Sequence, residues 1–122
     1  MPIKKEIQSA IAMHSMWKAR LDKCIETGEF DTPLHIVEQD DQCHLGKWLY
    51  GENIPPAIRA SEAYQKVRDS HAQFHQVAAK VVELALAGNK QEAYRIMSSN
   101  GEYTKATTDL VSKMMEWANS IE

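Results

Sequence analysis

The sequence is poor in cysteine, with two among 122 residues, and it contains no long uninterrupted apolar run. A membrane-spanning helix needs about 20 mainly apolar residues. A secretory signal needs a continuous apolar block, which the N-terminal segment MPIKKEIQSAIAMHSMW does not provide. Two cysteines without an export signal are typical of a reducing compartment, where a thiol is free or holds a metal. We therefore expect a cytoplasmic protein that does not cross a membrane.

The sequence also lacks a cluster of basic residues. Its 14 Lys and Arg residues are scattered among 17 Asp and Glu residues, giving a formal net charge of −3. Nucleic-acid-binding domains concentrate positive charge on one face, so this class of function is disfavoured. The chain length is typical of one domain, and we expect residues 1–122 to form a single domain around one core.

No β-strand pattern of useful length is present, and helical spacing dominates. Apolar residues recur every three or four positions in three long stretches, which places them on one face of a helix. The first stretch covers residues 3–27, the second 64–85 and the third 93–121. Gly28 ends the first. Gly101 lies inside the third and costs about 1 kcal/mol relative to alanine in a helix, which predicts either a kink or a tight turn between two helices; we favour a kink.

The segment between the first two stretches carries a short helix. Residues 28–42 have no sustained periodicity and contain Pro33, so we expect a surface loop. A helix over residues 43–50 follows, with Asp40 or Asp41 placed to cap it. The fold class is therefore all-α: a mostly antiparallel four-helix-type bundle with three long elements. The short helix carrying the Cys43 motif fills the fourth side with its loops.

Three histidines lie on the apolar faces of the long helices. His14 is in phase with the apolar residues of the first helix, where an imidazole costs free energy unless it has a partner. His71 and His75 are four residues apart, about 6 Å along a helix axis, so both rings can reach one ion. The alternative to metal binding is a structural role, because a single buried histidine is more often hydrogen-bonded to a carbonyl than bound to a metal. A lone His-x-x-x-His pattern is also common by chance.

Cys43 changes this balance because it adds a soft sulfur donor. Three imidazoles and one thiolate suit tetrahedral Zn²⁺. The loop before Cys43 is long enough to return it to the level of His14. A position near a helix start favours the thiolate, although Cys43 could also be a small buried apolar residue. The predicted metal ligands are His14, Cys43, His71 and His75.

The remaining candidates are weaker. His35 and His44 are expected to be exposed to solvent, and Cys24, about 80° around the helix from His14, is expected to be a half-buried thiol outside the site. Gly46 would allow another backbone or an imidazole to approach closely. An apolar wall around the site is expected from Trp17, Trp48 and Leu49.

Three motifs together resemble the chemoreceptor zinc-binding domain, CZB: HSMW at 14–17, CHLGKWLYG at 43–51 and HAQFH at 71–75. The resemblance implies that His14, Cys43, His71 and His75 are zinc ligands in a helical bundle that often forms a homodimer. It also implies a regulatory role in bacterial signalling, in chemotaxis or cyclic-di-GMP control. The implied partner is a chemoreceptor or a diguanylate cyclase, and Cys43 would be a redox trigger for hypochlorous acid.

A site closed by four protein ligands leaves no position for substrate, which argues against an enzyme and for a regulatory module. Two other functions remain open. One is a structural partner-binding bundle in which the histidines are incidental. The other is a ferritin-like or hemerythrin-like di-iron protein, which needs inward carboxylates and Glu-x-x-His pairs. Glu62, Asp69 and Glu83 do not lie at such offsets from His71 or His75, so we rate this function below the others.

Overall fold

The computed structural model describes residues 3–52 and 54–121, with the side chain of His44 excepted, and these residues contain helices and no strand. The elements in chain order are α1 (Ile3–His14), α2 (Met16–Thr27), α3 (Leu34–Val37), α4 (His44–Tyr50), α5 (Pro56–Arg59), α6 (Glu62–Leu86), α7 (Lys90–Met97) and α8 (Glu102–Ser120).

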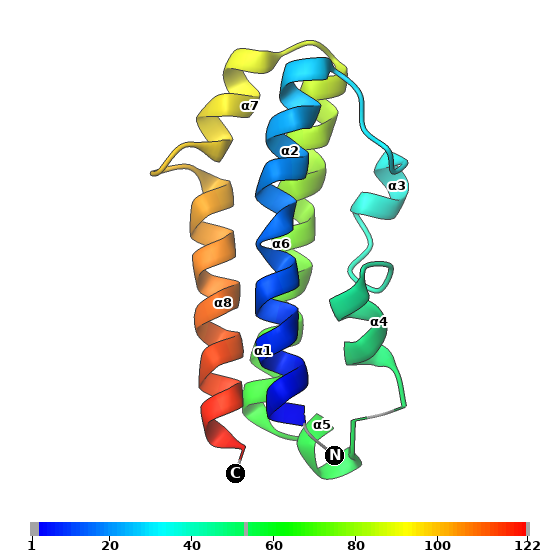
Figure 1. The fold of residues 1–122 in the computed structure, drawn as a ribbon, viewed down its shortest axis with the longest axis vertical. Coiled ribbons are helices and arrows are strands. Elements are labelled where there is room, and N and C mark those ends of the chain that lie inside the picture. Colours follow the sequence, from blue (N-terminus) through cyan, green and yellow to red (C-terminus); the bar gives the residue numbers. More distant parts are fainter. Residues whose placement is uncertain (1–2, 53, 122) are drawn as a thin grey trace.

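The long elements form an up-down bundle (Figure 1). The chain rises through α1 and α2, returns through α3 and α4, rises again through α6 and descends through α7 and α8. The short helices α3 and α4 occupy the side opposite α8, as Figure 1 shows. The prediction of an all-α, mostly antiparallel bundle with a short helix at the Cys43 motif is confirmed.

The predicted first helix is interrupted once, at Ser15, between α1 and α2. The Ser15 hydroxyl donates a hydrogen bond to the carbonyl of Ala12, 2.6 Å away, a side-chain contact that often bends helices. The end of α2 agrees with the prediction, because Gly28 adopts a left-handed conformation with φ of 75° and donates its N–H to the Cys24 carbonyl.

The preference for a kinked helix in the last third of the chain is wrong. Helix α7 ends at Met97, a tight turn follows, and α8 begins at Glu102. Gly101 allows this turn because a Cβ placed on it would lie 2.1 Å from the carbonyl oxygen of Ile96. The backbone thus passes directly against the end of α7, which only a residue without a side chain permits.

Two elements of four residues, α3 and α5, are absent from the prediction. Each begins directly after a proline, Pro33 and Pro55. Proline fixes φ at a value suited to the start of a helix, but four residues are too few for a periodic apolar pattern. Helix α3 matters for the site because its last residue, Val37, is buried.

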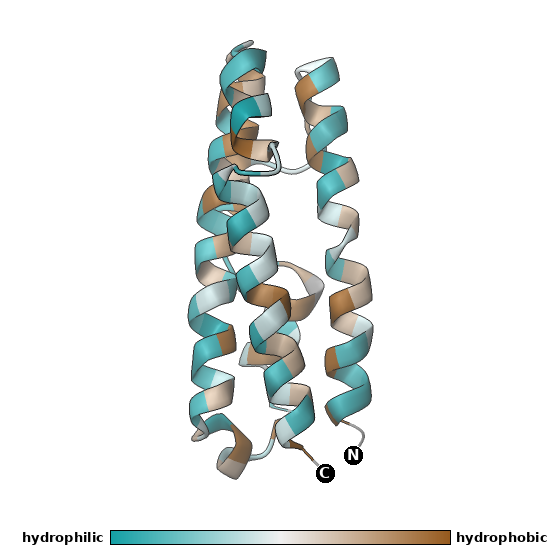
Figure 2. Ribbon diagram, turned by 90° about the vertical axis from the view of Figure 1, so that its left-hand side faces the viewer, coloured by the Kyte–Doolittle hydropathy of each residue, from teal (hydrophilic) through white to brown (hydrophobic). Residues whose placement is uncertain are grey.

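One hydrophobic core joins residues of α1, α2, α3, α4, α6, α7 and α8. Figure 2 shows hydrophilic and hydrophobic residues interspersed along each long helix, as expected of amphipathic helices around a shared interior. Within the described residues, no helix is both long enough and apolar enough to cross a membrane.

Candidate metal site

Three buried histidines meet between α1 and α6. His14 is the last residue of α1, and His71 and His75 are one turn apart on α6. Their exposed fractions are 6%, 0% and 1%. One ring nitrogen of each lies within 4.8 Å of the other two. The structure therefore brings together all three histidines that the sequence analysis selected.

Cys43 adds a sulfur atom next to two of the three histidines, His71 and His75. Its Sγ is 3.3 Å from Nε2 of His71 and 3.3 Å from Nε2 of His75, and these two nitrogens are 3.0 Å apart. Ligands of a tetrahedral zinc ion lie about 3.4 Å apart for two nitrogens and about 3.6 Å apart for nitrogen and sulfur, given the usual bond lengths. These three spacings are a few tenths of an ångström shorter, so a small outward relaxation would let Cys43, His71 and His75 hold the ion. The His14 nitrogen lies within 4.8 Å of a nitrogen of each other histidine and would have to move toward the ion together with its helix end.

The orientation of the His75 ring is fixed by α3. Its Nδ1 lies 2.9 Å from the carbonyl oxygen of Val37. A carbonyl only accepts hydrogen bonds, so Nδ1 carries the proton and Nε2 presents its lone pair to Cys43 and His71. Metal-binding histidines are commonly oriented by such a contact on the second ring nitrogen. The sequence analysis missed Val37 because a backbone acceptor has no residue signature.

Two ring nitrogens of the group have no hydrogen-bond partner among the described residues: Nε2 of His14 and Nδ1 of His71. An unsatisfied buried polar atom costs about 1–3 kcal/mol. The carbonyl-bonded alternative therefore describes one ring nitrogen of His75 but leaves the other two histidines unexplained. A cation between the rings would bind Nε2 of His71 and of His75 and could partner the free Nε2 of His14, whereas Nδ1 of His71 points away from the Cys43 sulfur and would gain no partner from it.

Burial keeps the three imidazoles neutral. It lowers the pKa of His14 to about 4 and that of His71 to about 2, with neighbouring histidines adding to both effects. The pKa of His75 is also lowered by burial, although its bond to the Val37 carbonyl opposes this. Neutral imidazole is the form that binds metal ions, so these rings are ready to coordinate at pH 7.

The helix start favours the Cys43 thiolate as expected, but burial outweighs this effect in the protein alone. Burial raises the pKa of the thiol, and the N–H groups of Gly46 and Leu45 offset this only in part. A positive charge next to the sulfur is needed to stabilise the thiolate, and a bound metal cation supplies one.

Cys43 itself, and neither aspartate, caps α4. Its side chain accepts a hydrogen bond from the N–H of Gly46, with 3.4 Å between N and Sγ. Asp40 instead accepts a hydrogen bond from the hydroxyl of Tyr50, at the other end of the helix. The expectation for Gly46 holds, since a Cβ there would lie 1.8 Å from the carbonyl oxygen of Asp40. This close contact between the backbones of Gly46 and Asp40 fixes the position of Cys43 at the start of α4.

Two family models match this sequence. The model described as the chemoreceptor zinc-binding domain matches residues 14–82, which is more than half of the chain and includes His14, Cys43, His71 and His75. The chain belongs to the chemoreceptor zinc-binding (CZB) domain family. A second model, described as a four helix bundle sensory module for signal transduction, matches residues 58–121 and so extends from α5 to α8. No curated protein and no solved structure matches the chain.

The apolar wall around the CZB histidines differs in part from the expectation. The Trp17 ring lies 5.5 Å from the His75 ring, centroid to centroid, and Phe74, which was not among the residues expected in this wall, lies 4.1 Å from the His14 ring. Trp48 instead packs on Trp117, in the last turns of α8, at 5.6 Å. Leu49 is buried, and its carbonyl accepts a hydrogen bond from Tyr64.

The other titratable candidates lie outside the group. His35 is exposed, as expected, and the His44 side chain lies outside the described residues. Cys24 is more buried than expected, at 1% exposure, because α2 packs there against both α6 and α7. The carboxylates considered for a di-iron site, Glu62, Asp69 and Glu83, are all exposed.

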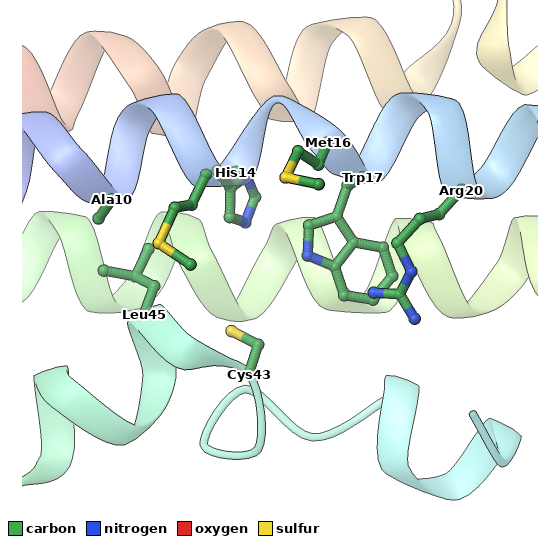
Figure 3. Close-up of a pocket in the computed structure, with 8 residues that line it drawn as sticks. Ala10, His14, Met16, Trp17, Arg20, Cys43 and Leu45 are labelled. Atoms are coloured by element: carbon green, nitrogen blue, oxygen red, sulfur yellow. The ribbon is translucent and has the colours of Figure 1, made fainter. Parts of the chain in front are cut away.

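Cys43 is the member of the group that is only half-buried. A cavity of about 260 Å³ lies beside it, lined by α1 and α2 on one side and by Cys43 and Leu45 on the other. Figure 3 shows the Cys43 sulfur directed toward the stretch of α1 and α2 that carries His14 and Trp17. A second cavity of about 110 Å³ borders Cys43 and His75 from the side of the loop. Small molecules can therefore approach the sulfur more readily than the buried rings.

Proposed function

We propose that this chain is a zinc-binding regulatory domain of a signalling system, with His14, Cys43, His71 and His75 holding one Zn²⁺. The observation that carries this proposal is the triangle of Cys43 Sγ and the Nε2 atoms of His71 and His75, with sides of 3.0–3.3 Å. Three nitrogens and one sulfur form a donor set that suits zinc, and four protein ligands leave no position for a substrate. The CZB family match supports the same metal.

Zinc in this site would tie together segments that are distant in the sequence. His14 ends α1, the two other histidines lie on α6, and Cys43 begins α4. The bound cation would supply the positive charge that stabilises the Cys43 thiolate against burial. When zinc is absent, α4 and the loop before it lose an anchor on the bundle. Site occupancy would then alter the surface that a partner contacts.

Oxidation of Cys43 is the proposed trigger for such a change. In the reaction with hypochlorous acid the thiolate takes up the oxygen atom to form sulfenic acid, and chloride leaves. The oxidised sulfur is a poor zinc ligand. The half-buried position of Cys43 beside an open cavity supports this assignment, because the oxidant can reach the sulfur first.

The proposed partner is a signalling protein, either a chemoreceptor or a diguanylate cyclase. The proposed assembly is a homodimer in which residues 1–122 of each chain form a single domain. The match to a sensory module for signal transduction supports a signalling partner. Helix α1 begins and α8 ends at the same end of the bundle (Figure 1). A change in the packing of α4 would reach this end through the contact between Trp48 and Trp117.

Metal analysis of purified protein tests the proposal. We expect one zinc per chain in the wild type and in His35→Ala, which removes an exposed histidine of α3. His14→Ala and Cys43→Ala should each lose most of the zinc after dialysis against a weak chelator, because each removes a ligand. Full retention of zinc by both variants, or two irons per chain in the wild type, would contradict the proposal.

The redox trigger is tested separately with zinc-loaded protein and a zinc-sensitive dye. One equivalent of hypochlorous acid should release zinc from the wild type and from Cys24→Ser, whose thiol is buried away from the site. Cys43→Ser, loaded at higher zinc concentration, should show no oxidant-dependent release. An equal release of zinc from Cys43→Ser would contradict the proposal that Cys43 is the redox trigger, but it would not contradict the proposal of zinc binding.

A further inference from the structure

Arg20 on α2 packs its guanidinium group against two aromatic rings. Its guanidinium carbon lies 4.4 Å from the centroid of the Trp17 ring and 4.8 Å from that of the Phe30 ring. The two rings are themselves stacked, with centroids 6.3 Å apart and an angle of 29° between their planes. Trp17 belongs to the same helix, whereas Phe30 lies in the loop after Gly28. Arg20 therefore holds the start of this loop against α2.

The same guanidinium group binds the next two residues of the loop. Its Nη2 donates hydrogen bonds to Oδ1 of Asp31 at 2.9 Å and to Oγ1 of Thr32 at 3.2 Å. The hydrogen bond from Arg20, together with one from Thr32, lowers the pKa of Asp31. The planar guanidinium can stack on rings and donate along its edge at the same time, which a lysine ammonium cannot do.

The clamped loop leads directly to the proposed zinc site. A few residues further on, the Val37 carbonyl orients His75, and Cys43 follows at the end of the loop. Arg20 also borders both cavities that touch Cys43, and its neighbour Trp17 contacts the His75 ring. Displacement of the loop would thus remove the sulfur ligand and the carbonyl contact together.

We propose that Arg20 is a positioning residue that clamps residues 30–32 onto α2 and thereby sets the rate at which the site releases zinc. The proposal rests on the proposed zinc-binding function. Among the four proposed ligands, Cys43 lies at the end of the loop, whereas the three histidines belong to long, packed helices. Local opening of a loop is the low-energy route by which a buried site exchanges with solvent. The contacts of Arg20 resist this opening.

The test is the transfer of zinc from loaded protein to an excess of a coloured chelator. In Arg20→Gln we expect release about tenfold faster than in the wild type, from the loss of stacking and of a charged hydrogen bond. Lys18→Gln is the matched control. It removes the ion pair between Lys18 and Asp22, which are 3.0 Å apart on the same helix and do not contact the loop. Its release rate should equal that of the wild type.

Further variants separate positioning from general stability. Arg20→Lys keeps the charge and should still release zinc faster than the wild type, and Asp31→Asn combined with Arg20→Gln should add little to the single change. The zinc-free forms of Arg20→Gln and Lys18→Gln should melt at similar temperatures.

Release from Arg20→Gln at the wild-type rate would overturn the inference, and so would a loss of zinc-free stability large enough to account for the faster release. A wild-type protein that binds no zinc would instead overturn the proposed function.

Discussion

Replacement of Gly46 by alanine is a sharp test of how the backbone places Cys43. The added Cβ would lie 1.8 Å from the carbonyl oxygen of Asp40, 2.7 Å from its carbonyl carbon and 2.9 Å from the Cα of Asp41. These are backbone atoms, which cannot rotate away as a flexible side chain would. Ordinary contact requires the Asp40 carbonyl to move by roughly 1.5 Å.

The cost of this movement has two parts. Overpacking of this size lowers the free energy of unfolding by about 1–3 kcal/mol. Asp40 and Asp41 lie three and two residues before Cys43, and the N–H of Gly46 bonds to the Cys43 sulfur. Displacement of this segment should misplace Sγ relative to the two Nε2 atoms. We expect zinc affinity in Gly46→Ala to fall at least about tenfold, as for other changes that misorient a ligand.

Gly101→Ala provides the control for a loss of stability alone. Its Cβ would lie 2.1 Å from the Ile96 carbonyl oxygen, a clash of similar severity between α7 and α8. Chemical denaturation of zinc-free protein should show a comparable destabilisation in both variants, whereas competition with a zinc chelator should show weaker binding only in Gly46→Ala. Wild-type zinc affinity in Gly46→Ala would refute the assigned role of this close contact.

Two further predictions concern the titratable residues of the zinc-free protein. Burial lowers the pKa values of His14, His71 and His75 below the unfolded value of 6.5, so the unfolded chain binds more protons as pH falls below 6.5. The free energy of unfolding, measured with urea, should decrease by on the order of 3 kcal/mol from pH 7 to pH 5, and a flat profile would contradict the burial of neutral rings. In thiol labelling, Cys43 should react within the folded state and Cys24 only on unfolding; equal rates under native conditions would contradict their different burial.

The sequence was sufficient to predict the features that depend on helical periodicity. The apolar spacing through His14 and the four-residue spacing of His71 and His75 determine which faces turn inward, and these rings do meet. The approach of Cys43 could be predicted because the loop is long enough and sulfur complements the imidazoles. Both inferences rest on side-chain chemistry and on periods that extend over several turns.

The remaining features depend on contacts that leave no such pattern. The Val37 carbonyl that orients His75 is a backbone group in a four-residue helix. The turn before Gly101 depends on how closely the chain returns to the end of α7, and a glycine alone is compatible with a kink as well. The pKa of Cys43 depends on a balance between burial and amide contacts that only the packed structure defines.

X-ray absorption spectroscopy of the purified protein at the zinc edge tests the central claim most directly. The account predicts one sulfur at about 2.3 Å and three nitrogens at about 2.0–2.1 Å, with the sulfur contribution replaced in Cys43→Ser and unchanged in Cys24→Ser. A first coordination shell made of oxygen, or one that lacks sulfur in the wild type, would contradict the assignment of Cys43 and the three histidines as the zinc ligands.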